Sequence, residues 1–139
     1  MKGHCLCGNV TMELEDTNTF EACHCMICRR WGSGPLMAIH SHSKSDIQGE
    51  ESMTVYPFSA WAERAFCHKC GTNLYYHQLK SETYVLSLGL FQDHSDFIFE
   101  SQIFIDRKPD YYEFSNDTVN LTQQQLFDKF TEKGIKPKD

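Results

Sequence analysis

Residues 67–71 read Cys-His-Lys-Cys-Gly, and residues 5–8 near the N-terminus read Cys-Leu-Cys-Gly. A short spacing between two cysteines places both thiols on one tight turn, where they can share a tetrahedral zinc ion. The glycine after each pair lets the backbone turn beneath the sulfurs. We therefore expect one four-cysteine structural zinc site, formed by Cys5, Cys7, Cys67 and Cys70. The alternative is that these are free cysteines of the core.

A third group, Cys23, Cys25 and Cys28, lies between these motifs and is followed by arginines in place of a glycine. Three thiolates without a clear fourth ligand predict a zinc ion with one open coordination position, which is typical of a catalytic site. The alternative is a second structural site, closed by a histidine or by another chain. His24 lies between two of the ligands, and strand-like alternation predicts that its ring points away from the metal.

The residues that follow this group predict a substrate site. Zinc with three thiolates has a formal charge of −1, which Arg29 or Arg30 could offset; either could also bind a substrate carboxylate. Gly32, Ser33 and Gly34 come next, and such a loop can present backbone N–H groups to an anion. The alternatives are an arginine that only covers surface and a simple turn.

The rest of the chain predicts a mainly β fold. A length of 139 residues suggests one domain spanning residues 1–139. Polar and apolar residues alternate in short segments separated by Asn, Asp, Gly and Ser, as in a meandering antiparallel sheet. The predicted strand segments are 10–14, 35–40, 52–58, 61–66, 72–78, 83–88 and 96–105.

One helix is expected near the C-terminus. Thr122 and Gln125 form a capping box at its start. Leu121 and Leu126 occupy the positions of a hydrophobic staple, and Gly134 suits the position just after the helix. We interpret this helix as packing without chemistry of its own.

Composition limits the compartment and the partners. The N-terminus has no apolar segment typical of a signal peptide, and no apolar run approaches the ~20 residues of a membrane span. We therefore expect a cytoplasmic protein, where disulfides are rare and seven cysteines point to metal binding. A net charge of −6 argues against a nucleic-acid partner.

The cysteine motifs resemble those of the glutathione-dependent formaldehyde-activating enzyme family, which also includes centromere protein V. The resemblance rests on residues 3–10 (Gly-His-Cys-Leu-Cys-Gly-Asn-Val), 23–30 (Cys-His-Cys-Met-Ile-Cys-Arg-Arg) and 64–71 (Arg-Ala-Phe-Cys-His-Lys-Cys-Gly). It implies a β-tent architecture of folded antiparallel sheets and the same division into a structural and a catalytic zinc. It also implies that the segment of Arg29, Arg30, Trp31, Gly32 and Ser33 lies where the family contacts glutathione.

The activity implied by this resemblance is that of a carbon–sulfur lyase acting in reverse. The glutathione thiol would add to formaldehyde and give S-hydroxymethylglutathione. The second half of the chain departs from the family pattern at residues 87–91 (Ser-Leu-Gly-Leu-Phe) and at Tyr111 and Tyr112. These departures do not change the cysteines of either metal site. They bear on which thiol and which electrophile are the substrates.

Two other functions are compatible with the same residues. One is a thiol carrier or sensor that binds glutathione without turnover, and the other is a zinc-ribbon module that binds a protein. We expect a monomer or a homodimer.

Overall fold

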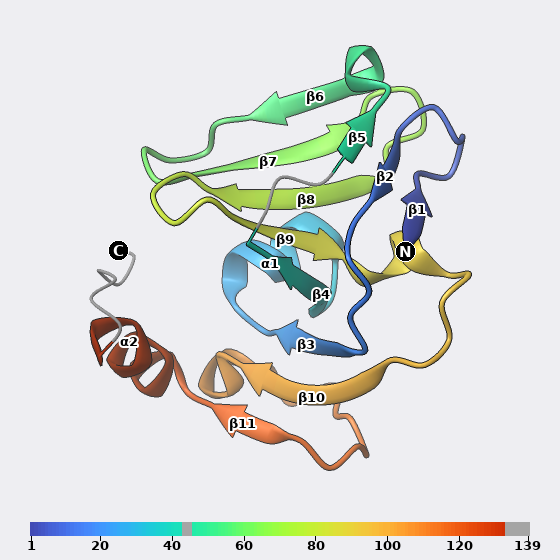
Figure 1. The fold of residues 1–139 in the computed structure, drawn as a ribbon. Coiled ribbons are helices and arrows are strands. Elements are labelled where there is room, and N and C mark those ends of the chain that lie inside the picture. Colours follow the sequence, from blue (N-terminus) through green and yellow to red (C-terminus); the bar gives the residue numbers. More distant parts are fainter. Residues whose placement is uncertain (43–45, 133–139) are drawn as a thin grey trace. The chain divides into compact units, whose positions relative to one another are not determined.

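The computed structural model describes residues 1–42 and 46–132. The chain divides into two compact units, one formed by Met1–Asn18 and Ile39–Phe97 and the other by Thr19–Ala38 and Ile98–Asp139. Figure 1 shows the path of the chain through its strands. Eleven strands lie in the described residues, so the mainly β fold is confirmed.

The first unit contains an antiparallel meander and a small three-stranded sheet. The meander has the order β9-β8-β7-β6, and every neighbouring pair is antiparallel, as predicted. Its strands are β6 (Met53–Tyr56), β7 (Ala62–Cys67), β8 (Asn73–Gln78) and β9 (Thr83–Ser87). The small sheet has the order β1-β2-β5, with β1 (Lys2–His4), β2 (Thr11–Glu13) and β5 (Asp46–Gln48).

Two 3-10 helices, η1 (Glu50–Ser52) and η2 (Leu88–Phe91), complete this unit. Strand β1 packs closely against η2, because a Cβ atom at Gly3 would lie 2.7 Å from the ring of Phe91. Only a glycine fits there without a shift of its neighbours.

The second unit contains both antiparallel and parallel pairs. Its strands β3 (Thr19–Cys23), β10 (Ile98–Ile103) and β11 (Val119–Leu121) lie beside the first half of β4 (Leu36–Ser41), in the order β11-β10-β3-β4. Strand β3 pairs antiparallel with β4, but β10 is parallel to both β3 and β11. The prediction of an antiparallel meander is therefore wrong for β10. Strand β3 comes from a distant part of the chain, and the connection from β10 to β11, which includes η3 (Ile105–Arg107), is long enough for a parallel return.

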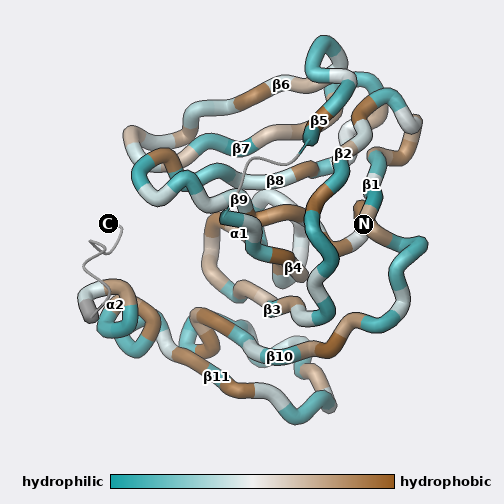
Figure 2. Tube along the Cα trace, viewed as in Figure 1, coloured by the Kyte–Doolittle hydropathy of each residue, from teal (hydrophilic) through white to brown (hydrophobic). Residues whose placement is uncertain are grey.

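Every predicted strand segment overlaps an observed strand, but β1, β3, β5 and β11 were not predicted. These strands have three to five residues, which is too short for a clear alternation. Polar and apolar patches also follow one another in short stretches along the described chain in Figure 2. None of the described helices is long and apolar enough to cross a membrane.

The C-terminal helix α2 (Gln123–Glu132) begins as predicted. The N–H of Thr122 donates to the side chain of Gln125 at 2.8 Å, and the N–H of Gln125 donates to the Thr122 hydroxyl at 3.2 Å. The predicted C-terminal Gly134 lies outside the described residues. A second helix, α1 (Met26–Gly32), was not predicted.

Candidate metal centres

The first unit brings together the four cysteines of the two glycine-containing motifs. The sulfur atoms of Cys5, Cys7, Cys67 and Cys70 all lie within 4.8 Å of one another. The Cys7 sulfur lies 3.6 Å from that of Cys5 and 3.8 Å from that of Cys67. A tetrahedral zinc ion with ~2.3 Å bonds separates its sulfur ligands by about 3.8 Å, so the observed spacing fits this metal. These sulfur–sulfur distances are far too long for disulfide bonds, and all seven cysteines are free thiols.

Two similar turns create this arrangement. The N–H of Cys5 and that of Cys67 each donate to the carbonyl five residues later, at 3.0 and 2.9 Å. The N–H groups of Gly8 and Gly71 close the turns onto the carbonyls of Cys5 and Cys67 at 3.1 and 2.7 Å. Both glycines have φ near +80°, although a Cβ atom there would meet nothing within 4 Å. Glycine is therefore favoured here by backbone conformation and not by lack of space.

Hydrogen bonds aimed at sulfur support the four-cysteine cluster. The N–H of Val10 donates to the Cys5 sulfur at 3.3 Å. The Thr72 hydroxyl accepts from the N–H of Leu6 at 3.0 Å and lies 3.2 Å from the Cys70 sulfur. Hydrogen bonds from the Thr72 side chain and backbone lower the pKa of the Cys70 thiol to about 5. These contacts favour thiolates, the form in which cysteine binds metal.

The second unit brings together Cys23, Cys25 and Cys28, whose sulfur atoms also lie within 4.8 Å of one another. Cys23 ends strand β3, and Cys25 is the N-cap of helix α1. The Cys25 sulfur accepts the N–H of Cys28 at 3.3 Å, as the side-chain oxygen of a serine or aspartate does at other helix starts. Cys23 and Cys28 are buried, whereas Cys25 is half-buried.

The three thiols influence one another's ionisation. Hydrogen bonds from Cys23 and Cys28, together with backbone N–H groups, lower the pKa of the Cys25 thiol to about 2. Hydrogen bonds with Cys25 and Cys28, together with burial, raise the pKa of the Cys23 thiol well above its ordinary value. The cluster therefore stabilises one thiolate strongly and resists a second negative charge. A borderline or soft cation such as zinc would relieve that repulsion, so the donor set fits a metal ion.

An apolar core lies behind the three thiols. Cys23 and Cys28 cluster with Ile103, and further half-buried side chains pack against this group, namely those of Leu36, Phe104, Leu121 and Leu126. Leu121 and Leu126 belong to the predicted staple of helix α2. The C-terminal helix therefore supplies packing, as expected, and part of that packing supports the three-cysteine cluster.

His24 is fully buried between two of the cysteines, but it is not part of their cluster. Its Nδ1 atom lies 2.7 Å from the Tyr112 hydroxyl, and its Nε2 atom lies 2.7 Å from Oε1 of Gln102. Burial lowers the pKa of the His24 ring, which is therefore neutral near pH 7. Both ring nitrogens are engaged, so the structure does not support His24 as the fourth ligand. No sequence motif indicated Tyr112 or Gln102 as its partners.

The segment predicted to contact substrate forms the end of helix α1 and the residue after it. Arg29 is half-buried, and its Nε atom donates to the carbonyl of His24 at 3.0 Å, whereas Arg30 is exposed. Trp31 is half-buried, Gly32 ends the helix, and Ser33 has a left-handed backbone with φ of 69°. The N–H of Ser33 donates to the Arg29 carbonyl at 2.8 Å. This N–H is thus engaged within the helix end, so the predicted presentation of backbone N–H groups to an anion does not apply to Ser33.

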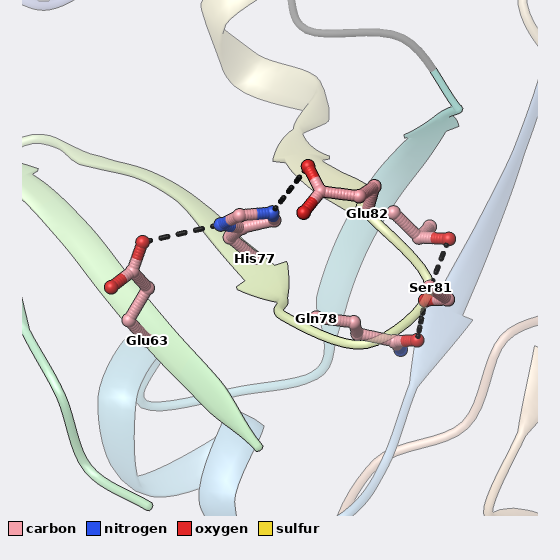
Figure 3. Close-up of polar contacts among 6 residues, drawn as sticks. Glu63, His77, Gln78, Ser81 and Glu82 are labelled. Atoms are coloured by element: carbon pink, nitrogen blue, oxygen red, sulfur yellow. Dashed lines mark hydrogen bonds and ion pairs between the residues drawn. The ribbon is translucent and has the colours of Figure 1, made fainter. Parts of the chain in front are cut away.

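A second buried histidine, in the first unit, has a different environment. Figure 3 shows His77 between two carboxylates, with Nδ1 at 3.1 Å from Glu63 and Nε2 at 3.6 Å from Glu82. Its ring stacks on Tyr84 with 4.1 Å between centroids. The two carboxylates face opposite nitrogens of the ring, so they do not converge on one ion. This group connects β7, β8 and the turn before β9.

Several known proteins are similar to this chain in sequence or in fold. The sequence model of a family described as glutathione-dependent formaldehyde-activating enzyme matches residues 1–107. An uncharacterized lyase of Schizosaccharomyces pombe is 34% identical over 127 residues, which cover 90% of this chain and 93% of that protein. A putative glutathione-dependent formaldehyde-activating enzyme of Halomonas elongata is 28% identical over 85 residues, or 54% of each chain. A crystal structure of a Rhodobacter sphaeroides protein has a TM-score of 0.58 and 29% identity, covering 68% of this chain and 91% of the other.

Proposed function

The chain belongs to the glutathione-dependent formaldehyde-activating enzyme family, and from this premise we propose that it is a zinc-dependent enzyme of the carbon–sulfur lyase type. The thiol of glutathione, or of a similar compound, adds to formaldehyde or to another small electrophile. A carbon–sulfur bond forms, the carbonyl π bond breaks, and the thiol proton ends on the new hydroxyl group. The product is an S-hydroxymethyl thiol adduct, and no electron donor or acceptor is required.

The observation that carries this proposal is the incomplete ligand set of the second unit. Cys23, Cys25 and Cys28 converge, and no fourth Cys, His or carboxylate among the described residues joins them. We assign these three thiols to a catalytic zinc and Cys5, Cys7, Cys67 and Cys70 to a structural zinc. The chemistry that zinc supplies in the three-thiol site, when bound, is to lower the pKa of a substrate thiol at its open position.

The chain's own residues have three tasks in this proposal. The apolar core behind Cys23 and Cys28 excludes water from one side of the site. Cys25 is half-buried and thus the most exposed of the three cysteines, and in this proposal the substrate approaches from its side. The guanidinium groups of Arg29 and Arg30 pair with the carboxylates of glutathione, and Trp31, Gly32 and Ser33 lie in the same contact segment. Holding thiol and aldehyde together removes much of the entropic cost of their encounter.

We further propose that residues 1–139 fold as one zinc domain of this family and that the protein acts in the cytoplasm. The seven free thiols are consistent with a reducing compartment. The net charge of −6 supports a small-molecule thiol over a nucleic acid as partner.

The test compares adduct formation from glutathione and formaldehyde with and without the zinc-loaded protein, followed by NMR. We expect a rate clearly above the uncatalysed one, and no reaction of S-methylglutathione, whose sulfur is blocked. Cys25→Ser should lose one zinc per chain, keep the other, and fall to the uncatalysed rate. Glutathione binding without any rate increase would contradict the enzyme and leave a thiol carrier or sensor. Full zinc content and full activity in Cys25→Ser would contradict the site.

A further inference from the structure

A directed chain of hydrogen bonds runs through the second unit beside the three thiols. It connects Tyr112 to His24 at 2.7 Å, His24 to Gln102 at 2.7 Å, Gln102 to Thr118 at 2.9 Å, and Thr118 to Asn120 at 2.7 Å. The amide nitrogen of Gln102 donates to Thr118, so its oxygen is the atom that faces His24. His24 therefore carries its proton on Nε2, and Nδ1 accepts the hydroxyl hydrogen of Tyr112. Each of the four hydrogen bonds thus pairs one donor with one acceptor.

The backbone of His24 is held as firmly as its ring. Its N–H donates to the carbonyl of Ile103 at 3.1 Å, and its carbonyl accepts from Arg29 at 3.0 Å. The ring also lies over that of Tyr112, with 5.6 Å between centroids. Because Cys23 and Cys25 are the immediate neighbours of His24, a fixed His24 restricts the backbone from which both thiols project.

Three of the five residues in this network come from a segment that the family match does not include. The match ends at residue 107, and Tyr112, Thr118 and Asn120 lie beyond it. Lys108 fixes the start of the segment, because its ammonium group donates to the carbonyl of Tyr112 at 2.6 Å and to that of Pro109 at 3.1 Å. The same ammonium lies 5.3 Å from the centre of the Tyr112 ring.

We propose that Tyr112 is a positioning residue for the three-thiol site, which it orders through His24. This inference rests on the proposed role of Cys23, Cys25 and Cys28 as metal ligands. Hydrogen bonds behind a metal site keep its ligands in the binding arrangement, and their loss commonly weakens metal binding by about 10–100-fold. Tyr112→Phe keeps the ring and removes the hydroxyl, which leaves Nδ1 of His24 buried without a donor.

The test uses cobalt(II) as the probe in the full-length chain under anaerobic conditions, with chelator competition to measure each site. For Tyr112→Phe we expect about tenfold weaker binding at the weaker of the two sites, with altered visible d–d bands of that site. The stronger site should remain unchanged. Tyr111→Phe is the matched control, because Tyr111 is 80% exposed and lies next to Tyr112, and it should behave as the wild type does. Gln102→Leu removes the acceptor at Nε2 and should weaken the same site.

Three results would overturn the inference. They are equal affinities and spectra in Tyr112→Phe and the wild type, an equal loss at both sites, and a wild-type chain that takes up only one cobalt ion. If Tyr112→Phe does not fold, unchanged cobalt binding in Gln102→Leu overturns it. Activity is not part of this experiment. A wild type that binds two ions but shows no turnover therefore contradicts the proposed enzyme and not the positioning role.

Discussion

The two cysteine clusters are built in different ways. The four-cysteine cluster is formed by two similar backbone turns, each closed by its own amide hydrogen bonds and by a glycine at φ near +80°. The three-cysteine cluster consists of a strand end, an N-cap and the first turn of a helix. It is supported by side chains from distant parts of the chain, such as Gln102 and Tyr112. Local backbone geometry thus shapes each half of the first cluster, and contacts such as that between Leu6 and Thr72 join the two halves. Side chains from distant segments order the ligand turns of the second cluster.

The largest expected effect is the loss of a ligand from the four-cysteine cluster. Cys67→Ser should lower the free energy of unfolding by about 4 kcal/mol or more, because a structural metal site is among the strongest single contributions to stability. Urea unfolding and zinc content per chain measure the effect. Leu6→Ala, in an 85% exposed side chain on the same loop, should cost less than about 0.5 kcal/mol. If Cys67→Ser retained two zinc ions and the stability of the wild type, the four-cysteine cluster would not act as a structural metal site, which would contradict the comparison.

The next largest effect is expected on metal removal, because the two clusters should release zinc at different chelator concentrations. The binding free energy of structural zinc is roughly 10–16 kcal/mol for a site with four ligands. A site with three thiolates should therefore bind zinc more weakly by roughly 3 kcal/mol, or about 100-fold. A chelator titration, read by released zinc, should therefore show two steps. Cys25→Ser should abolish the step at low chelator concentration and leave the other in place. A single step that releases both ions together would mean that the clusters do not differ in affinity.

The glycine turns provide a smaller effect that is specific to the first cluster. Gly71→Ala places a Cβ atom at φ of +80°, which should cost about 1–2 kcal/mol of stability. Gly89→Ala is the matched control, because it too has open space around the added atom but no positive φ. Urea unfolding of both variants measures the difference. An equal cost for the two substitutions would show that backbone conformation does not shape the turn.

The smallest effect concerns the support of the second cluster. Thr122→Ala removes the cap of helix α2, whose Leu126 packs against the Cys23 and Cys28 group, and should cost about 1 kcal/mol. Thr131→Ala, in the same helix, removes only a hydroxyl bonded to the Phe127 carbonyl and should change stability by less than about 0.5 kcal/mol. Thermal unfolding compares the two variants. A larger loss in Thr131→Ala would contradict the predicted capping role.

Sequence reasoning recovered most of the first cluster and of the strands. Alternation predicted the meander from β6 to β9, and the capping box at Thr122 predicted the start of α2. It missed helix α1, because that helix has only seven residues and is capped by Cys25, a residue type without a capping signature. It also missed the parallel pairing of β10, since a strand's partners are not encoded in its own alternation.

The amino-acid sequence by itself determined the three cysteine motifs, their expected division into groups of four and three, and the glycine turns. These features depend on residue type and on spacing over a few positions, which covalent geometry converts directly into local structure. Alternation already predicted that the ring of His24 points away from the cysteines, but only the tertiary structure decided what it contacts, because its partners Gln102 and Tyr112 are 78 and 88 residues away. Contacts between such distant residues form only after the whole unit has folded, so no local pattern records them.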